Sequence, residues 1–321
     1  MMDEEMNASI FIRCDGLYIT YYSRYPSEGI YRSIDLLVIV TNILLSVIGS
    51  IANGAIIAAY YRNKRLRNEH NMLLCVLACT DIIVTAILQP LFVITKFGNL
   101  LASFDSCVLW NINSLVSYVC LCVSMLCLVL ISMERFAVLY YACRYKTIVT
   151  HRRIKVGVCC SWLLVLLVAC LHITVRVHQV TFMFYAILSL FSIVICVYLG
   201  VYTEKLLRHH RKSIKHNQGV TMNRNQIKAQ KKTVLLTRTA YFIGGTLLAC
   251  YLPGIVMLVY EGVKYSTDPD FYFIVRPCII TLMYVNSALD PCLVLWRNRE
   301  IRETAAHVFD RTRWGGSNSS M

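Results

Sequence analysis

The chain has 321 residues, of which 57% are hydrophobic and 16% are charged. Ordinary soluble domains contain about 45–50% apolar and about 25% charged residues, so this composition excludes a soluble protein. The formal charge of +14 would suggest nucleic acid as the partner of a soluble chain, but in an apolar chain the position of the basic residues matters first. Most of the 15 Cys lie within apolar runs, where we expect small buried hydrophobes rather than a disulfide framework.

The long apolar runs predict the fold. A membrane-spanning helix needs roughly 20 mainly apolar residues, and seven such stretches lie near residues 34–60, 72–95, 107–133, 156–176, 179–203, 234–260 and 271–296. The start of the chain is acidic, unlike a signal peptide, so the first stretch is expected to be a membrane helix. The predicted fold class is an all-α membrane protein, a seven-transmembrane helix bundle over residues 34–296 that follows an N-terminal segment, residues 1–33.

The basic residues predict the orientation. Most of the 32 Lys and Arg lie in the links after the first, third and fifth stretches and in the tail. Because basic loops stay in the cytoplasm, we expect a plasma-membrane protein with its N-terminus outside and its C-terminus inside. Residues 297–321 predict a short amphipathic helix and a cytoplasmic tail, with the basic face against membrane lipids rather than nucleic acid. Asn7 begins a glycosylation sequon on the extracellular side.

Few ionisable residues interrupt the apolar stretches. A charge at mid-membrane costs about 2.5–3.5 kcal/mol on insertion scales, so such residues indicate a function. Asp81 lies within the second stretch, Glu134 and Arg135 end the third, and Asp290 lies near the end of the seventh. Each of them alone is also compatible with a single satisfied polar contact, or with an ion pair that anchors a helix at the headgroups.

Together with Asn53, Trp162, Pro253 and Asn286–Pro291, these residues resemble the markers of the rhodopsin-like (class A) G-protein-coupled receptors over residues 34–310. The run Tyr141–Thr150, the very short link near residues 172–182 and the lack of Pro in the fifth stretch are similar to the melanocortin, adenosine, cannabinoid and lysophospholipid branch. The resemblance implies a receptor and not an enzyme. Such a receptor converts binding of an extracellular ligand into activation of heterotrimeric G proteins.

The resemblance also implies roles for individual residues. The G-protein switch comprises Glu134, Arg135 and Tyr198. The activation elements are Tyr251, Pro253, Asp290 and Pro291. The set that resembles the family's sodium pocket is Asp81, Ser124, Asn286, Ser287 and Asp290. Two carboxylates with nearby oxygens suit a sodium ion as an allosteric modulator, and the alternative is that one Asp is neutral and hydrogen-bonded.

Three departures from the family pattern leave alternatives open. Tyr251 stands where the family usually has Trp, and Val294 stands where it usually has Tyr, so a receptor-like protein that does not signal is an alternative. The outer loop that usually supplies a disulfide partner has no Cys. Cys107 is therefore expected to pair with Cys14 or Cys278, or to remain a free thiol.

The ligand class follows from the residues expected to line the cavity. The seventh stretch has no Lys for a Schiff base, which excludes retinal. The side chains expected to line the cavity are mostly apolar with a few hydroxyls, so they favour a lipid or other small apolar ligand, with a peptide as the alternative. They are Ser117, Tyr118, Leu121, Ile255, Leu258, Arg276, Ile280 and Tyr284. Arg276 is expected at the outer mouth of the cavity, where it could meet an anionic head group. The alternative for several of the other seven residues is that they only pack helices against each other.

Two other classes compete with a receptor. An ion pump or channel could use Asp81 and Asp290, but seven spans do not divide into two equal inverted repeats. An intramembrane hydrolase would need its His residues to converge, and the chain has no His-Glu-x-x-His run. No cofactor is required by this account, and the sparse Ser residues of the tail leave arrestin as an optional partner.

Overall fold

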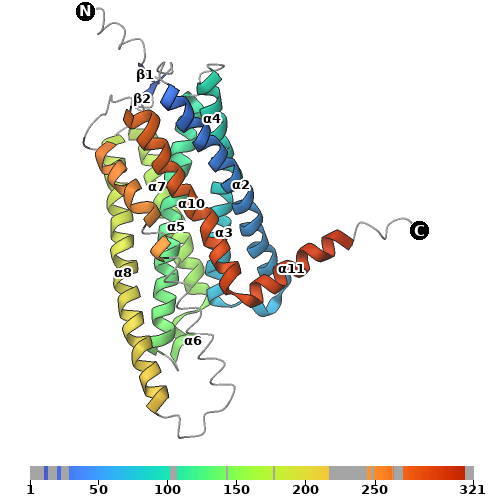
Figure 1. Cartoon of the computed structure of the whole chain (residues 1–321). Coiled ribbons are helices and arrows are strands. Elements are labelled where there is room, and N and C mark those ends of the chain that lie inside the picture. Colours follow the sequence, from blue (N-terminus) through green and yellow to red (C-terminus); the bar gives the residue numbers. More distant parts are fainter. Residues whose placement is uncertain are drawn as a thin grey trace, which may run out of the picture.

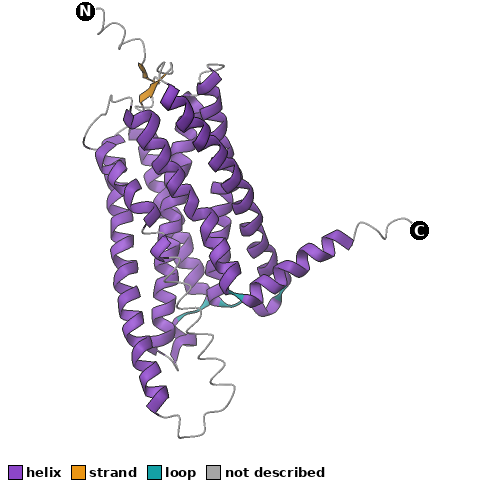
Figure 2. Cartoon of the chain, in the orientation of Figure 1, coloured by secondary structure: helices purple, strands orange, loops and turns teal. Residues whose placement is uncertain are grey.

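The computed structural model describes residues 11–13, 20–22, 29–101, 107–141, 144–175, 178–216, 244–246, 249–261, 263 and 270–314. These residues are almost entirely helical (Figure 2). Seven helices are long and apolar enough to cross a membrane, which confirms the predicted seven-helix fold. The exception to the helical pattern is a pair of three-residue strands, β1 Phe11–Arg13 and β2 Thr20–Tyr22, which pair antiparallel and were not predicted.

The seven spanning helices alternate in direction (Figure 1). In chain order, the helical elements are α2 Gly29–Arg62, η1 Lys64–Leu66, α3 Glu69–Ile83, η2 Val84–Leu88, α4 Gln89–Leu101, α5 Cys107–Tyr141, α6 Tyr145–Ile148, α7 His151–Val175, α8 His178–His216, the helix Gly244–Glu261, η4 Phe271–Val275, α10 Arg276–Arg297 and α11 Arg299–Trp314. The bundle has one end at which α2 begins, the Gly29 end, and an opposite end at which α11 lies, the α11 end. Helix α2 begins five residues before the predicted first stretch, because Tyr31 is buried against Phe273.

The second spanning helix continues through a proline because of a wider turn. The segments α3 and α4 are joined by the π-helical segment η2, in which the N–H of Gln89 bonds to the carbonyl of Val84. Pro90 has no N–H to offer, so the carbonyl of Thr85 loses both of its helical partners. The hydroxyl of Ser46 in α2 donates to this carbonyl at 2.6 Å. The carbonyl that has no partner within its own helix is therefore bonded to α2.

Helix α2 packs closely at the same level because Gly49 has no side chain. A Cβ atom there would lie 2.5 Å from Thr85 Cγ2 and 3.3 Å from the Cβ of Ala288 in α10. Asparagines above and below add bonds between helices: Asn42 Nδ2 donates to Thr281 Oγ1 at 2.9 Å, and Asn53 Nδ2 donates to the carbonyl of Ser287 at 3.0 Å. Close approach at small residues and such polar bonds stabilise helix pairs in lipid, where hydrophobic association is weak.

Helix α11 leaves the α11 end of the bundle at an angle to the spanning helices (Figure 1). Ile301 and Ala305 are buried in the main core, whereas Arg299 and Arg302 on the other face are exposed. Asn63 Nδ2 donates to Thr304 Oγ1 at 3.2 Å, so the helix is fixed against the end of α2. The predicted short amphipathic helix is confirmed.

We expect Gly49→Ala to destabilise the bundle by roughly 1–3 kcal/mol, because the added methyl group overlaps Thr85 in a packed core. Gly54→Ala is the matched control, since no atom lies within 4 Å of a Cβ at that helical position. The control should be neutral or stabilising by up to about 1 kcal/mol. The measurement is thermal unfolding of the purified protein.

The double variant Gly49→Ala/Thr85→Ser removes the methyl group that the new Cβ meets, while it keeps the hydroxyl that donates to the backbone carbonyl of Asp81. It should recover most of the loss. Equal midpoints for Gly49→Ala and Gly54→Ala would show that α2 does not depend on this close approach.

Candidate functional site

A cluster of largely buried ionisable groups lies at the α11 end of the bundle. Arg135 Nε lies 2.7 Å from Glu134 Oε2, and the two side chains are only 4% and 3% exposed. The same carboxylate has two further partners from other elements. His70 Nδ1 in α3 lies 3.3 Å from Oε2, and the hydroxyl of Tyr145 in α6 donates to Oε1 at 3.0 Å. Three elements, α3, α5 and α6, therefore converge on one carboxylate.

This geometry holds Arg135 in place. Separating a buried ion pair is costly, because removing one partner leaves an uncompensated charge in a medium of low dielectric constant. Burial, and then the charge of Glu134, raise the pKa of the Tyr145 phenol, which stays protonated and continues to donate. The family resemblance assigned Glu134 and Arg135 to one switch, whereas His70 and Tyr145 were missed because only the fold brings them to this carboxylate.

Tyr198, the third residue assigned to the switch, lies elsewhere. It is 67% exposed on α8 and stacks on Tyr202, whose ring packs edge-on against Phe136 at 5.6 Å. In this conformation Tyr202 is thus the tyrosine of α8 that contacts the residue after Arg135. A contact between Tyr198 and Arg135 requires a different arrangement of the helices.

The polar residues assigned to a sodium pocket gather in the middle of the bundle. Asp81 in α3 lies beside the hydroxyl of Ser287 in α10, and Asn286 Nδ2 donates to Asp290 Oδ2 at 2.9 Å. Ser124 in α5 lies on the face of Cys120 and Cys127, which are both within electrostatic range of Asp81. All five residues of the set are fully buried: Asp81, Ser124, Asn286, Ser287 and Asp290.

This acid cluster, the five residues just named, contains oxygens without partners. Both carboxylate oxygens of Asp81, one of Asp290, the amide oxygen of Asn286 and the hydroxyls of Ser124 and Ser287 have no hydrogen bond of good geometry. Buried acceptors without partners are costly, so these oxygens fit a hard cation such as sodium. Among the described residues, no three His, Cys, Asp or Glu side chains gather as a site for a transition metal would need.

Of the residues predicted as activation elements, Tyr251 and Pro291 lie beside this cluster. Tyr251 is buried in the Gly244–Glu261 helix, and its hydroxyl is within electrostatic range of both Asp81 and Asp290. Pro253 follows two residues later, and Pro291 lies inside α10 directly after Asp290. Each proline removes one helical hydrogen bond and weakens its helix at that level. Where the family has a tryptophan, this chain places a phenol beside the acids.

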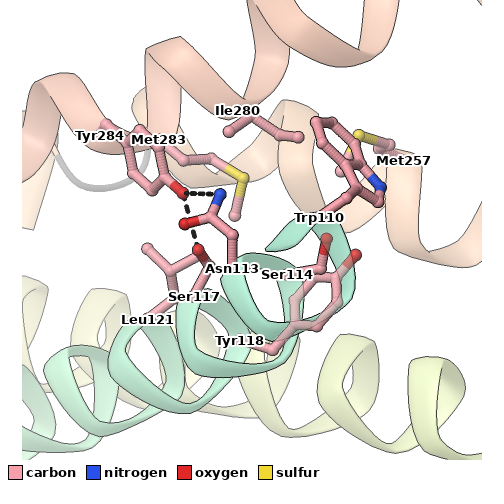
Figure 3. A pocket seen from close by; sticks show the side chains of 10 residues that line it. All are labelled: Trp110, Asn113, Ser114, Ser117, Tyr118, Leu121, Met257, Ile280, Met283 and Tyr284. Atoms are coloured by element: carbon pink, nitrogen blue, oxygen red, sulfur yellow. Dashed lines mark hydrogen bonds between the residues drawn. The ribbon is translucent and has the colours of Figure 1, made fainter. Parts of the chain in front are cut away.

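A small pocket lies between α5, α10 and the Gly244–Glu261 helix, toward the Gly29 end (Figure 3). Its free volume is about 20 Å³, little more than one water molecule needs. The pocket is lined by Trp110, Asn113, Ser114, Ser117, Tyr118, Leu121, Met257, Ile280, Met283 and Tyr284. Five of these belong to the predicted lining: Ser117, Tyr118, Leu121, Ile280 and Tyr284.

The predicted lining differs from the pocket in two ways. Ile255 and Leu258 are buried but do not line this pocket, whereas Met257 of the same helix does. Trp110, Asn113 and Ser114 were missed, although they lie seven, four and three residues before Ser117 on one face of α5. Helical spacing from Ser117 could have found all three.

The interpretation of Arg276 as a residue open at the mouth is not supported. Arg276 is 2% exposed, its Nε lies 3.0 Å from Glu261 Oε1, and its guanidinium lies 4.9 Å from the centre of the Trp110 ring. Another ion pair, Lys96 Nζ with Asp35 Oδ1 at 3.0 Å, is buried, and Lys96 Nζ lies 6.0 Å from the centre of the same Trp110 ring. We call these two ion pairs the ionic layer.

The remaining predicted sites fall outside the described side chains. Asn7 and Cys14 lie outside the described residues, and Cys107 begins α5 but its side chain is not among those described. Cys278, the alternative disulfide partner, is an exposed free thiol. The glycosylation and disulfide predictions therefore stay predictions.

The family model of the 7 transmembrane receptor (rhodopsin family) matches residues 52–293. This match covers most of the chain, so the chain belongs to the rhodopsin family of seven-transmembrane receptors. The family agrees with the seven spanning helices and with the motifs at Asn53, Asp81, Arg135 and Pro291. The protein is thus a multi-pass membrane protein of a receptor family, not of an enzyme family.

Proposed function

We propose that this receptor converts binding of an extracellular ligand into activation of heterotrimeric G proteins at the plasma membrane. The observation that carries the proposal is the closed contact between Glu134 and Arg135 at the α11 end, at 2.7 Å. The pair is buried under His70 and Tyr145, so Arg135 is withheld from any partner that docks at this end. An outward swing of the Gly244–Glu261 helix about Pro253 would release it.

The proposed orientation puts the α11 end in the cytoplasm. That end carries the basic links after α2 and α5, the basic residues Lys205 and Arg208 near the end of α8, and the basic face of α11, and basic segments remain on the cytoplasmic side. The G protein would then meet Arg135 from the side on which it resides. Arrestin is a second proposed partner there, and Asn7 would be glycosylated on the opposite side.

The proposed branch is that of the melanocortin, adenosine, cannabinoid and lysophospholipid receptors. Two observations support it. Only residues 176 and 177 separate α7 from α8, and α8 contains no proline along its 39 residues. The ligand that fits this reading is a lipid or other small apolar molecule, because the pocket lining is largely apolar and lacks a free charge; a peptide is the weaker alternative.

We also propose that the acid cluster binds sodium as an allosteric modulator. The support is the set of buried oxygens without partners between α3, α5 and α10. A cation there would compensate Asp81 and Asp290 and would tie the three helices together at the level of Tyr251. The alternative is a proton on one of the two carboxyl groups.

Arg135→Ala should lower activation of a responsive G protein at least about tenfold, since the released guanidinium would no longer reach the partner. The matched control is Arg152→Ala, an exposed arginine at the start of α7 near the same end. Dissociation of a panel of G proteins is measured in cells, without ligand and with lipid, peptide and amine libraries, at equal surface expression. Equal signals from Arg135→Ala and the wild type, or silence of the wild type throughout, would contradict the proposal and favour the non-signalling alternative.

Sodium chloride should raise the melting temperature of the purified wild type relative to N-methylglucamine chloride, by about 2–4 °C for each kcal/mol of binding free energy. Asp81→Asn should abolish the difference, whereas Glu204→Gln, which removes an exposed carboxylate in α8, should keep it. A sodium-dependent shift that survives in Asp81→Asn would exclude this cluster as the site.

A further inference from the structure

Two polar atoms of the pocket are buried without a partner. Asn113 and Trp110 line the pocket and are only 3% and 5% exposed, yet Asn113 Oδ1 and Trp110 Nε1 have no hydrogen bond. The first is an acceptor and the second is a donor. A buried polar atom left unpaired is costly, so a ligand that pairs with either atom gains more than an apolar contact supplies.

A hydroxyl pair lies beside these atoms (Figure 3). Ser117 Oγ and the hydroxyl of Tyr284 are 2.7 Å apart, and Asn113 Nδ2 donates to the same Tyr284 hydroxyl at 3.4 Å. All of these groups are uncharged, and none of the ten lining residues is an acid, a lysine, an arginine or a histidine. The polar part of the pocket therefore offers hydrogen bonds without a countercharge.

The nearest charges are already compensated. Arg276 is paired with Glu261, and Lys96 with Asp35, each at 3.0 Å; Arg276, Lys96 and Asp35 are buried, and Glu261 is 13% exposed. Both cations lie near the Trp110 ring that forms one wall of the pocket, Arg276 at 4.9 Å and Lys96 at 6.0 Å from its centre. A charged ligand would have to break one pair of the ionic layer and leave its partner unpaired, which costs more than the new contact returns.

The rest of the lining is apolar and adaptable. A free volume of about 20 Å³ admits no organic ligand, so side chains must move on binding. Met257 and Met283 both line the pocket, and unbranched thioethers repack at low cost. Leu121 and Ile280 complete an apolar surround for the body of a ligand.

From these contacts we infer that the pocket selects a neutral ligand, with an apolar body and one group that both donates and accepts hydrogen bonds, such as a hydroxyl or a primary carboxamide, and that it rejects ligands charged at that group. This inference rests on the proposed receptor function and specifies its ligand class. The group would meet Asn113 and Tyr284, and the apolar body would lie among the methionines.

The test uses four ten-carbon probes that differ only in the head: decan-1-ol, decanamide, decanoate and decylammonium. Binding to the purified receptor in lipid nanodiscs is measured as the shift in melting temperature, without any G protein. Because all amphiphiles partition into lipid to some extent, each probe is compared between the wild type and Tyr284→Phe, which loses one hydroxyl. Tyr185→Phe is the matched control, because Tyr185 is equally buried beside Tyr118 but does not line the pocket.

We expect decanol and decanamide to stabilise the wild type and Tyr185→Phe at concentrations about tenfold lower than Tyr284→Phe requires. Asn113→Leu should weaken both neutral probes further, and if that variant does not fold, Ser117→Ala supplies the same information. Decanoate and decylammonium should show the same weak effect in all variants, as partition into lipid alone would give.

Tighter or equal binding of either charged probe in the wild type would overturn the inference, and so would neutral binding that is unchanged in Tyr284→Phe. The absence of any shift with the two neutral probes would overturn it as well. None of these results affects the Arg135→Ala comparison, which measures G-protein activation. Failure of the ligand class and failure of the receptor function are therefore distinguishable.

Discussion

Glu134 holds Arg135 at 2.7 Å in a bundle whose surroundings are hydrocarbon, and His70 and Tyr145 bind the same carboxylate from two other elements. Both residues are buried away from water, so neither side chain can leave without a replacement partner. The ends of α3, α5 and α6 therefore share one electrostatic constraint. A docking partner that replaced Glu134 as the contact of Arg135 would release all three elements at once, which makes this pair suitable as a switch.

Buried carboxylates are compensated differently at the other levels of the bundle. Near the Gly29 end, Asp35 and Glu261 each have a basic partner, so the ionic layer is closed. In the middle, Asp81 and Asp290 are the buried carboxylates of the described residues without an ion pair. The bundle thus has ion pairs at both ends and, between them, an acid cluster without a basic partner among the described residues. The middle level is where an added cation or proton would change the stability of one conformation over another.

Much of this arrangement could be predicted from the sequence. The seven apolar stretches and the amphipathic α11 follow from local patterns, and the pairing of Glu134 with Arg135 follows from the family resemblance; the structure has each of them. The pairings of Arg276 with Glu261 and of Lys96 with Asp35 could not be predicted, because each joins different helices and no local spacing records it. Met257 lines the pocket and the predicted Leu258 does not, and a shift of one residue rotates a helix by about 100°.

The most direct test of the switch is the basal rate of nucleotide exchange on a responsive G protein, with purified receptor in nanodiscs and no ligand. Glu134→Gln removes the charge that holds Arg135 and keeps the size of the side chain, whereas Glu69→Gln removes a more exposed carboxylate at the same end, which pairs with His151. The account predicts a several-fold higher basal rate for Glu134→Gln and an unchanged rate for Glu69→Gln. A folded Glu134→Gln protein with a basal rate at or below that of the wild type would contradict it.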